Sequence, residues 1–446
     1  MTLLAALLPA AAVADEEKPG PLDPQRLEDE GVVIGKIVLE REDVFDLSNP
    51  KENNWLYRMA NKLHIVTQER VIEQQLLFSE GDVFSKRLAE ETARILRRNS
   101  YLYDAWITPL QREDGTVDLE VRTRDVWTLK PGFSFARSGG ENRTLIKLEE
   151  LNLFGWGQQV FVARSEDVDR ESTIFTFRDK NLGRSWTQLR MQYADSSDGH
   201  WNELSLIRPF YALDSRWTAG FRGSDFDGER RLYDLGEKAA EFRQEREYVT
   251  AFGGWSAGLR DGWVTRYTAG AAYERNTFSE VPVPEYPPAI PADRELVYPY
   301  FGIEILQDEF RTAQNREQIK RTEDFLVGTR FAATLGWSDE NFGADRDAAL
   351  YWLGASHTLG DIGKSAVLLR ADGSGRVEDG DAVNALMSVS ARWYNQQTDQ
   401  RTFFATLSGT WGHRLDLENP VELGGDTGRR GYPLRYQSGD SKLLLT

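Results

Sequence analysis

The sequence predicts a mainly β protein, in which a small α+β domain precedes an antiparallel transmembrane β-barrel. After Trp127, helical periodicity gives way to two-residue alternation of apolar and polar side chains. The connections between the alternating runs are short on one side and long on the other, as in outer-membrane barrels. No apolar stretch after the N-terminus reaches the ~18 residues of a membrane helix, which excludes a helical membrane protein.

Composition narrows the classes of function. The 446 residues include 54 Lys and Arg against 71 Asp and Glu, a formal net charge of −17, and no Cys. This acidity argues against a nucleic-acid-binding protein, which needs a basic surface. The lack of Cys excludes a disulfide scaffold and any Cys-ligated zinc or iron–sulfur site.

The N-terminus has the features of an export signal. Residues 3–14 are apolar and end in Ala12-Val13-Ala14, a small-x-small cleavage pattern that precedes an acidic stretch. We expect residues 1–14 to be a signal peptide and residues 15–30 to be an acidic linker. No basic segment precedes the apolar run, so the start of the signal peptide is either clipped or misassigned. The alternative is a buried N-terminal helix.

Residues 31–126 are predicted to form one small α+β domain. β-Branched and alternating runs predict its strands, and helical spacing behind capping residues predicts its helices. Asp114-Gly115 is a strong tight-turn dipeptide between the last two strands. The expected elements are strands at 32–39, 101–110 and 116–122, and helices at 52–63, after Thr67 and after Ser85.

Residues 127–446 are predicted to form the barrel. The alternating runs have about the length that a tilted strand needs to cross a bilayer, ~9–11 residues. Arg190, Arg330 and Arg392 fall on the inner face, which suits a water-filled lumen and not the alternative, a soluble β-sandwich or propeller. Runs such as 325–337 are expected to be single strands, 227–244 and 279–295 to be long polar loops, and 308–321 to be an unusually long connection on the short side.

We expect no enzyme, because no catalytic pattern stands out. The four His are far apart, and the sequence has no P-loop, dinucleotide fingerprint or Gly-x-Ser-x-Gly motif. The acidic residues 378–381 are more typical of a solvated loop than of a calcium site. A membrane-embedded hydrolase is the remaining enzyme alternative, with His413 as the candidate base.

The segment 423–432 differs from the other loops. Its glycines allow a tight path back into the barrel, and an Arg beside an aromatic ring can pair with carboxylates of the lumen wall. The alternative is an ordinary Gly-rich surface loop. The residues expected in a lumen loop are Gly425, Asp426, Arg430, Gly431 and Tyr432, and Glu304 is the candidate partner of Arg430, between Ile303 and Ile305 that should face lipid.

This segment resembles the Arg-Gly-Phe/Tyr loop motif of the BamA/TamA superfamily of outer-membrane proteins. Arg430, Gly431 and Tyr432 match its core positions, although the preceding residue, usually apolar, is Arg429 here. The module at 31–126 resembles one POTRA domain of the bacterial surface antigen type, with 41–66 as an insertion. Residues 77–84 resemble the turn between its two helices, and residues 152–157 resemble the first periplasmic turn of the barrel.

The resemblance implies a factor for protein insertion or protein transport in the outer membrane of Gram-negative bacteria. The POTRA domain would lie in the periplasm and bind unfolded client proteins by strand addition, and the barrel would insert or export them. The implied partners are outer-membrane lipid, clients and periplasmic accessory proteins, with no nucleic acid, nucleotide, metal or other cofactor. Four or five strands follow the motif loop in that family, so we expect a C-terminally truncated barrel. The alternative function is a passive porin or channel, which would need no POTRA domain.

Overall fold

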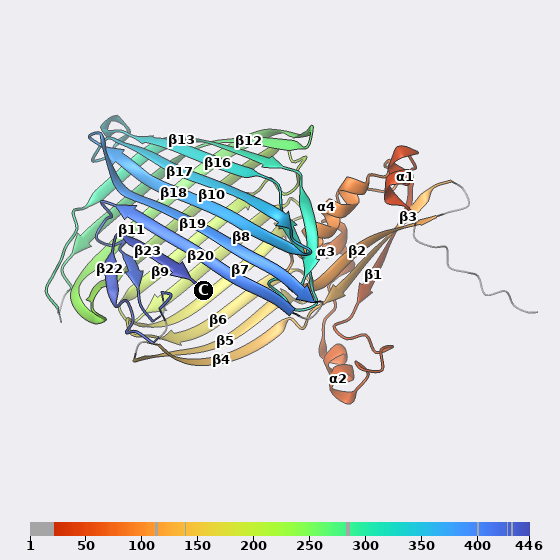
Figure 1. Cartoon of the computed structure of the whole chain (residues 1–446), viewed down its shortest axis with the longest axis horizontal. Coiled ribbons are helices and arrows are strands. Elements are labelled where there is room, and N and C mark those ends of the chain that lie inside the picture. Colours follow the sequence, from red (N-terminus) through yellow and green to blue (C-terminus); the bar gives the residue numbers. More distant parts are fainter. Residues whose placement is uncertain are drawn as a thin grey trace, which may run out of the picture.

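The computed structural model describes residues 22–111, 115–138, 140–281, 286–398, 401–425, 427–429 and 431–446. A small α+β domain and a large antiparallel β-sheet lie end to end (Figure 1), so the predicted fold class is confirmed. None of the helices in the described part of the chain is long and apolar enough to cross a membrane.

The N-terminal domain is a three-stranded sheet packed against helices. Its central strand β3 (Val117–Asp125) pairs in parallel with β1 (Ile34–Glu42) and antiparallel with β2 (Leu102–Gln111). Every second residue of β3 is buried, which places its apolar side chains in one core with the helices. The helices are α1 (Pro24–Asp29), α2 (Trp55–Leu63), α3 (Glu69–Glu73) and α4 (Lys86–Arg97), and Ser85 caps α4 as its sequence suggests. Asp114 of the expected tight turn lies outside the described residues.

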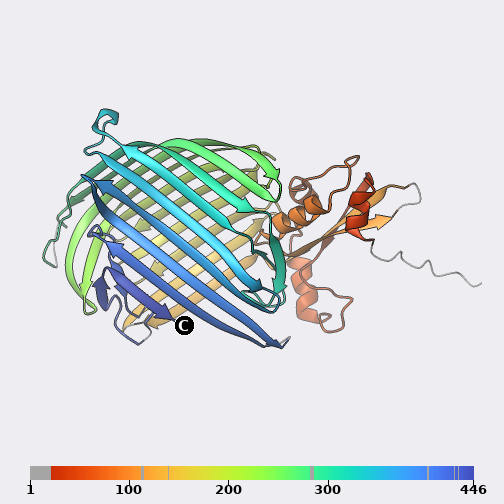
Figure 2. The same cartoon turned by 45° about the horizontal axis from the view of Figure 1, so that its top comes forward.

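The second part is a 16-stranded sheet that curls into a barrel (Figures 1 and 2). Strands adjacent in the chain pair antiparallel, with two exceptions. β13 pairs with β16 across an intervening hairpin, and β20 pairs with β23 across β21 (Val421–Leu423) and β22 (Gln437–Gly439). Among the described residues, the sheet begins at β4 and ends at β23. The strands are β4 (Leu129–Ser138), β5 (Glu141–Leu153), β6 (Gln158–Glu166), β7 (Glu171–Leu182), β8 (Thr187–Ser196), β9 (Gly199–Arg208), β10 (Trp217–Asp234), β11 (Glu237–Arg260), β12 (Trp263–Ser279), β13 (Arg294–Gln307), β16 (Arg330–Ser338), β17 (Ala348–Asp361), β18 (Ser365–Glu378), β19 (Asp381–Thr398), β20 (Arg401–His413) and β23 (Ser441–Leu445).

The barrel is apolar outside and largely polar inside. On β16, Phe331, Leu335 and Trp337 are exposed, whereas Arg330 of the opposite parity reaches a carboxylate in the lumen. This alternation is typical of strands that face lipid on one side and water on the other.

Two connections differ from the sequence prediction. Residues 227–244, expected as a loop, are mostly strand, because β10 and β11 run on to a turn at Leu235 and Gly236. Charged side chains of β10 and β11 form ion pairs on these strands, such as Arg243 with Asp227 at 2.5 Å. The polar sequence of this segment therefore belongs to strand ends that contact water and not to a loop.

The run 325–337 is not one strand. A hairpin strand, β15 (Thr322–Leu326), ends before it, and β16 begins at Arg330. Phe325 and Val327 pack into a buried cluster with Ile362, so their apolar character reflects this core and not lipid contact.

The N-terminal domain is attached directly to one end of the barrel, here called the near rim; the opposite end is the far rim (Figure 1). The Gln68 amide donates to Gly155 O at 2.9 Å, and the Asn152 side-chain amide donates to Thr67 Oγ1 at 2.8 Å. Gly155 has φ +75°, and an added Cβ would lie 2.7 Å from Val66 O, so only glycine fits this contact.

The long connection after β13 is a second attachment. It forms a hairpin of β14 (Phe310–Gln314) and β15, here called the junction hairpin. Arg97 of α4 forms a bidentate pair with Asp324 at 2.6 and 2.8 Å, and Arg321 donates to Leu102 O of β2 at 2.7 Å. The connection is therefore long because it holds the N-terminal domain against the rim.

Candidate functional site

The described residues 414–425, 427–429 and 431–436 belong to a loop that folds back into the barrel near the far rim, here called the lumen loop. It contains β21 (Val421–Leu423), which pairs with β22 (Gln437–Gly439) directly after the loop. A Cβ at Gly424 would lie 2.4 Å from Arg435 N, so glycine allows the two arms of the loop to approach each other.

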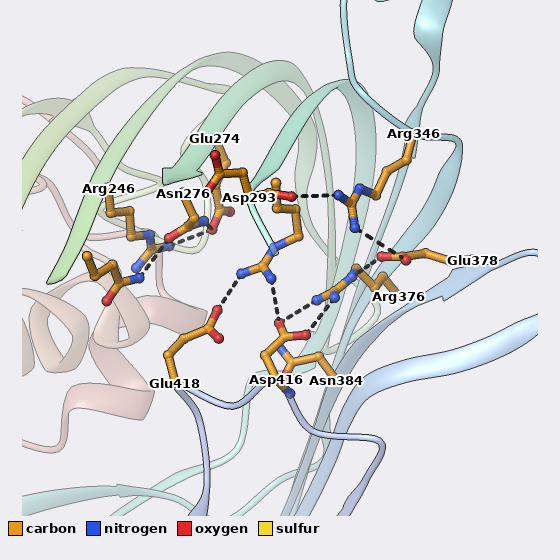
Figure 3. A network of polar contacts seen from close by, with 12 residues as sticks. Arg246, Glu274, Asn276, Asp293, Arg346, Arg376, Glu378, Asn384, Asp416 and Glu418 are labelled. Atoms are coloured by element: carbon orange, nitrogen blue, oxygen red, sulfur yellow. Dashed lines mark hydrogen bonds and ion pairs between the residues drawn. The ribbon is translucent and has the colours of Figure 1, made fainter. Parts of the chain in front are cut away.

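Two carboxylates of the lumen loop bind arginines of the barrel wall (Figure 3). Asp416 accepts two hydrogen bonds of 2.7 Å from Arg376 of β18. Arg294 of β13 lies 3.3 Å from Asp416 and donates to Glu418 at 2.6 Å. The four side chains are at most 9% exposed, so each charge depends on its partners for the solvation that water would give.

Further polar contacts extend this cluster along the wall. Arg376 also donates to Glu378, and Arg346 lies 3.7 Å from the same carboxylate and donates to Asp293 O at 2.8 Å (Figure 3). Arg246 pairs with Glu274 at 3.2 Å on the adjacent strands. The wall thus presents several paired charges, and the loop carboxylates join those around Arg376 and Arg294.

The other arm of the lumen loop binds a different part of the wall. Arg435 lies 2.7 Å from Asp169, in the turn between β6 and β7, and its guanidinium lies 4.7 Å from the ring centre of Tyr233 on β10. The Tyr233 hydroxyl donates to Asp169 at 2.6 Å. Because its two arms are held by well-separated strands, the loop crosses the lumen.

A polar cavity of about 520 Å³ remains between the lumen loop and the wall. Its lining mixes both charges, with Arg230, Arg231 and Arg435 facing Asp169 and Glu418. Such a volume suits water and small polar solutes.

The predicted motif residues fall partly within the described chain. Asp426 and Arg430 lie outside the described residues, so their predicted roles stay predictions. Gly425 N donates to Pro433 O at 3.0 Å, and Gly431 has φ +89° and directly precedes Tyr432 in the lumen loop. The guanidinium of Arg429 lies 4.1 Å from the Tyr432 ring centre, so this Arg is held by the aromatic residue of the motif.

Glu304 faces the lumen, but its described partners are arginines of the wall. It accepts from Arg266 at 2.9 Å and from Arg330 at 2.7 Å. Glu304 is ten residues along β13 from Arg294, roughly 33 Å at the usual rise per residue. Its predicted pairing with Arg430 stays a prediction.

The sequence analysis missed Asp416, Glu418 and Arg435, which form ion pairs with the wall. It expected a loop cation and a wall carboxylate. Arg435 and Asp169 form a pair of that kind at another position, whereas Asp416 and Glu418 pair with the opposite polarity. The available signal was the spacing of two acidic residues, two apart, just after the end of a strand.

A second buried polar cluster lies at the near rim. Asp125 accepts from Thr67 N at 2.7 Å, and His64 Nδ1 lies 3.1 Å from Asp43. Burial raises the pKa of the Asp125 carboxyl to about 6, although hydrogen bonds from Thr67 act against this rise. Since Asn152 also bonds Thr67, this carboxyl lies beside the attachment of the domain to the barrel.

No protein-family model matches the sequence, and no curated protein does. Among solved structures, the chain is similar to BamA from Haemophilus ducreyi lacking POTRA domains 1–3, at 8% identity and a TM-score of 0.36, covering 85% of this chain and 72% of that one. It is also similar to CdiB from Acinetobacter baumannii and from Escherichia coli, each at 12% identity and a TM-score of 0.42, covering 86% and 85% of this chain and 64% and 66% of theirs. Nothing about family or activity is carried over to this chain from these similarities.

Proposed function

We propose that this protein is an outer-membrane factor that inserts or translocates unfolded proteins. The observation that carries the proposal is the lumen loop, which crosses the lumen and is bound to the wall through Asp416, Glu418 and Arg435. A lumen occupied in this way does not suit a passive porin, which needs a permanently open path. The loop suits a barrel whose lumen opens only when another molecule displaces it.

The N-terminal domain supplies a site for unfolded clients. β1 pairs with β3 on one side. On its other side, Ile34 bonds the main chain of Gly81 and Asp82, and no described strand pairs with the edge after Ile34. An extended client segment can add to this edge through main-chain hydrogen bonds, which need no particular sequence. Val38, which is 45% exposed on β1, would contact the added segment.

The orientation follows from this role. We place the near rim and the N-terminal domain in the periplasm, where unfolded clients arrive, and the far rim outside the cell. The proposed role requires no enzyme activity, nucleotide or metal, because folding of the client releases the free energy that drives insertion.

Photo-cross-linking in cells tests client binding. A photoreactive amino acid at Val38 should form adducts with newly made outer-membrane or secreted proteins, and one at the exposed Glu90 of α4 should form few. Equal adduct formation at the two positions would contradict strand addition at β1.

Conductance separates the proposal from the porin alternative. In planar bilayers the wild-type protein should conduct rarely, and replacement of residues 415–435 by a short Gly-Ser linker should open it. A steady open conductance of the wild type, with no change when the loop is replaced, would favour a passive porin.

A further inference from the structure

The helix α2 exposes its apolar face. Trp55, Leu56, Met59 and Leu63 are 69%, 49%, 44% and 64% exposed, and α2 has no buried residue. At 3.6 residues per turn, these four side chains fall within an arc of about 100°. A surface helix normally turns such a stripe toward the core of its own domain, and α2 does not.

The opposite face of α2 is fixed to its own domain. The Tyr57 ring stacks on Phe45 with ring centres 3.9 Å apart. The Asn61 side chain accepts from Phe45 N at 3.1 Å and donates to Phe45 O at 2.8 Å. These contacts hold the helix so that its apolar face cannot rotate inward.

Two cations lie along one edge of the exposed apolar face. Lys62 and Arg58 are exposed and follow Trp55 on the helical wheel, between the apolar face and the packed side. A short helix with an apolar face and adjacent basic residues is typical of a segment that lies in the membrane interface, with its cations among lipid headgroups.

The apolar face of α2 continues onto the barrel rim. The chain leaving α2 contacts the turn between β5 and β6, where Gln68 donates to Phe154 O at 3.0 Å. Ile65, Phe154 and Trp156 are 54%, 56% and 42% exposed, so apolar surface connects the helix to the near rim. Figures 1 and 2 show α2 beside the rim at the margin of the barrel, where the surface of a surrounding membrane would lie.

We propose that α2 is a membrane-interface helix, which inserts Trp55, Leu56, Met59 and Leu63 into the lipid leaflet on the near-rim side. The occupant of the apolar face is lipid, because that face is continuous with the surface where the barrel meets the bilayer. The helix thereby fixes the N-terminal domain against the membrane as well as against the barrel. This inference rests on the barrel spanning a membrane, as the proposed function requires, but not on any client.

Lipid quenching in the full-length protein tests this inference. Because the chain has no Cys, an environment-sensitive fluorophore can be attached at a single introduced residue. We choose Met59→Cys on α2, Leu335→Cys on the outer face of β16 and Glu80→Cys on the distal side of the N-terminal domain. Each labelled protein is placed in nanodiscs of phosphatidylethanolamine and phosphatidylglycerol, with or without brominated acyl chains.

The expected result is quenching by brominated lipid at position 59 as at 335, and none at 80. Adding Leu56→Gln and Leu63→Gln should lower the quenching at 59 toward that at 80. Quenching at 335 but not at 59 overturns the proposal and leaves the membrane barrel intact. An apolar emission at 59 that brominated lipid does not quench indicates a protein partner and also overturns it. No quenching at 335 contradicts the membrane location, and with it the proposed function.

Discussion

Removing Asp416 tests whether ion pairs to the wall hold the lumen loop. In Asp416→Ala, Arg376 loses two hydrogen bonds of 2.7 Å and Arg294 loses one of its two carboxylate partners. Both guanidiniums remain in the wall at no more than 9% exposure, so water replaces the lost carboxylate poorly. We therefore expect the loop to leave the wall.

The size of this effect follows from burial. Arg376 keeps Glu378 and Arg294 keeps Glu418, so neither charge is left without a partner, and the loss is that of hydrogen bonds between charged groups, ~1.5–3 kcal/mol. At ~1.4 kcal/mol per factor of ten, this shifts the equilibrium toward the released loop by roughly 10- to 10²-fold. The matched control is Asp381→Ala, which removes the 2.6 Å pair between Asp381 and Arg414 at the start of the same loop. That pair is 69% and 52% exposed, so its loss should cost only ~0–1 kcal/mol.

Hydrogen exchange and conductance measure the release. In Asp416→Ala, amides of residues 414–424 should exchange faster by the factor above, and single-channel recordings should show more frequent openings. The control should resemble the wild type in both measurements. If Asp416→Ala exchanged no faster than the control, the wall pairs would not hold the loop. Arg376→Lys should give an intermediate result, because an ammonium cannot reproduce a bidentate guanidinium contact.

Three further predictions concern the N-terminal domain and the orientation. Arg97→Ala should raise protease cleavage between the domain and the barrel, because it breaks the junction-hairpin pair with Asp324; unchanged cleavage would show that this pair holds nothing. Asp125 has a pKa of about 6 against an ordinary 3.8, so its contribution to stability is full below pH ~4 and is lost, by about 3 kcal/mol, as the pH rises through 6. As the pH rises through this range, hydrogen exchange of the β3 amides should therefore speed up more in the wild type than in Asp125→Asn. A difference in protection between the two proteins that does not change with pH would refute the raised pKa of Asp125. A cysteine at Ser279 on the far rim should react with an impermeant reagent on intact cells and one at Gln397 on the near rim should not; the reverse would invert the topology.

Sequence periodicity predicts the barrel strands because one face of each strand contacts lipid and the other contacts the watery lumen. The period-two pattern on β16 places Phe331, Leu335 and Trp337 outside from the sequence alone. The pattern fails where an apolar residue packs inside the protein, as with Phe325 of the junction hairpin. It also fails where charged residues pair along a strand, as on β10 and β11, since a polar run there resembles a loop.

The candidate site was predictable only in part, for a related reason. The glycines after β20 predict a tight turn of the chain, because positive φ is a local property of glycine. The partners of the loop are not local. Arg294 and Arg376 belong to β13 and β18, which are not neighbours in the sheet and act together only through the curvature of the barrel.

The sheet register explains which wall charges remain for the loop. Glu304 lies directly across from Arg266 in the pairing of β12 with β13, and these two side chains form an ion pair within the wall. Arg294 instead lies across from Asn276, and both ion pairs described for it reach the lumen loop. An inward arginine whose cross-strand neighbour is uncharged therefore indicates a partner from elsewhere in the chain. Finding it requires the register of two adjacent strands, which alternation alone does not supply, because a slip of two residues leaves the apolar pattern unchanged and moves every charge pair.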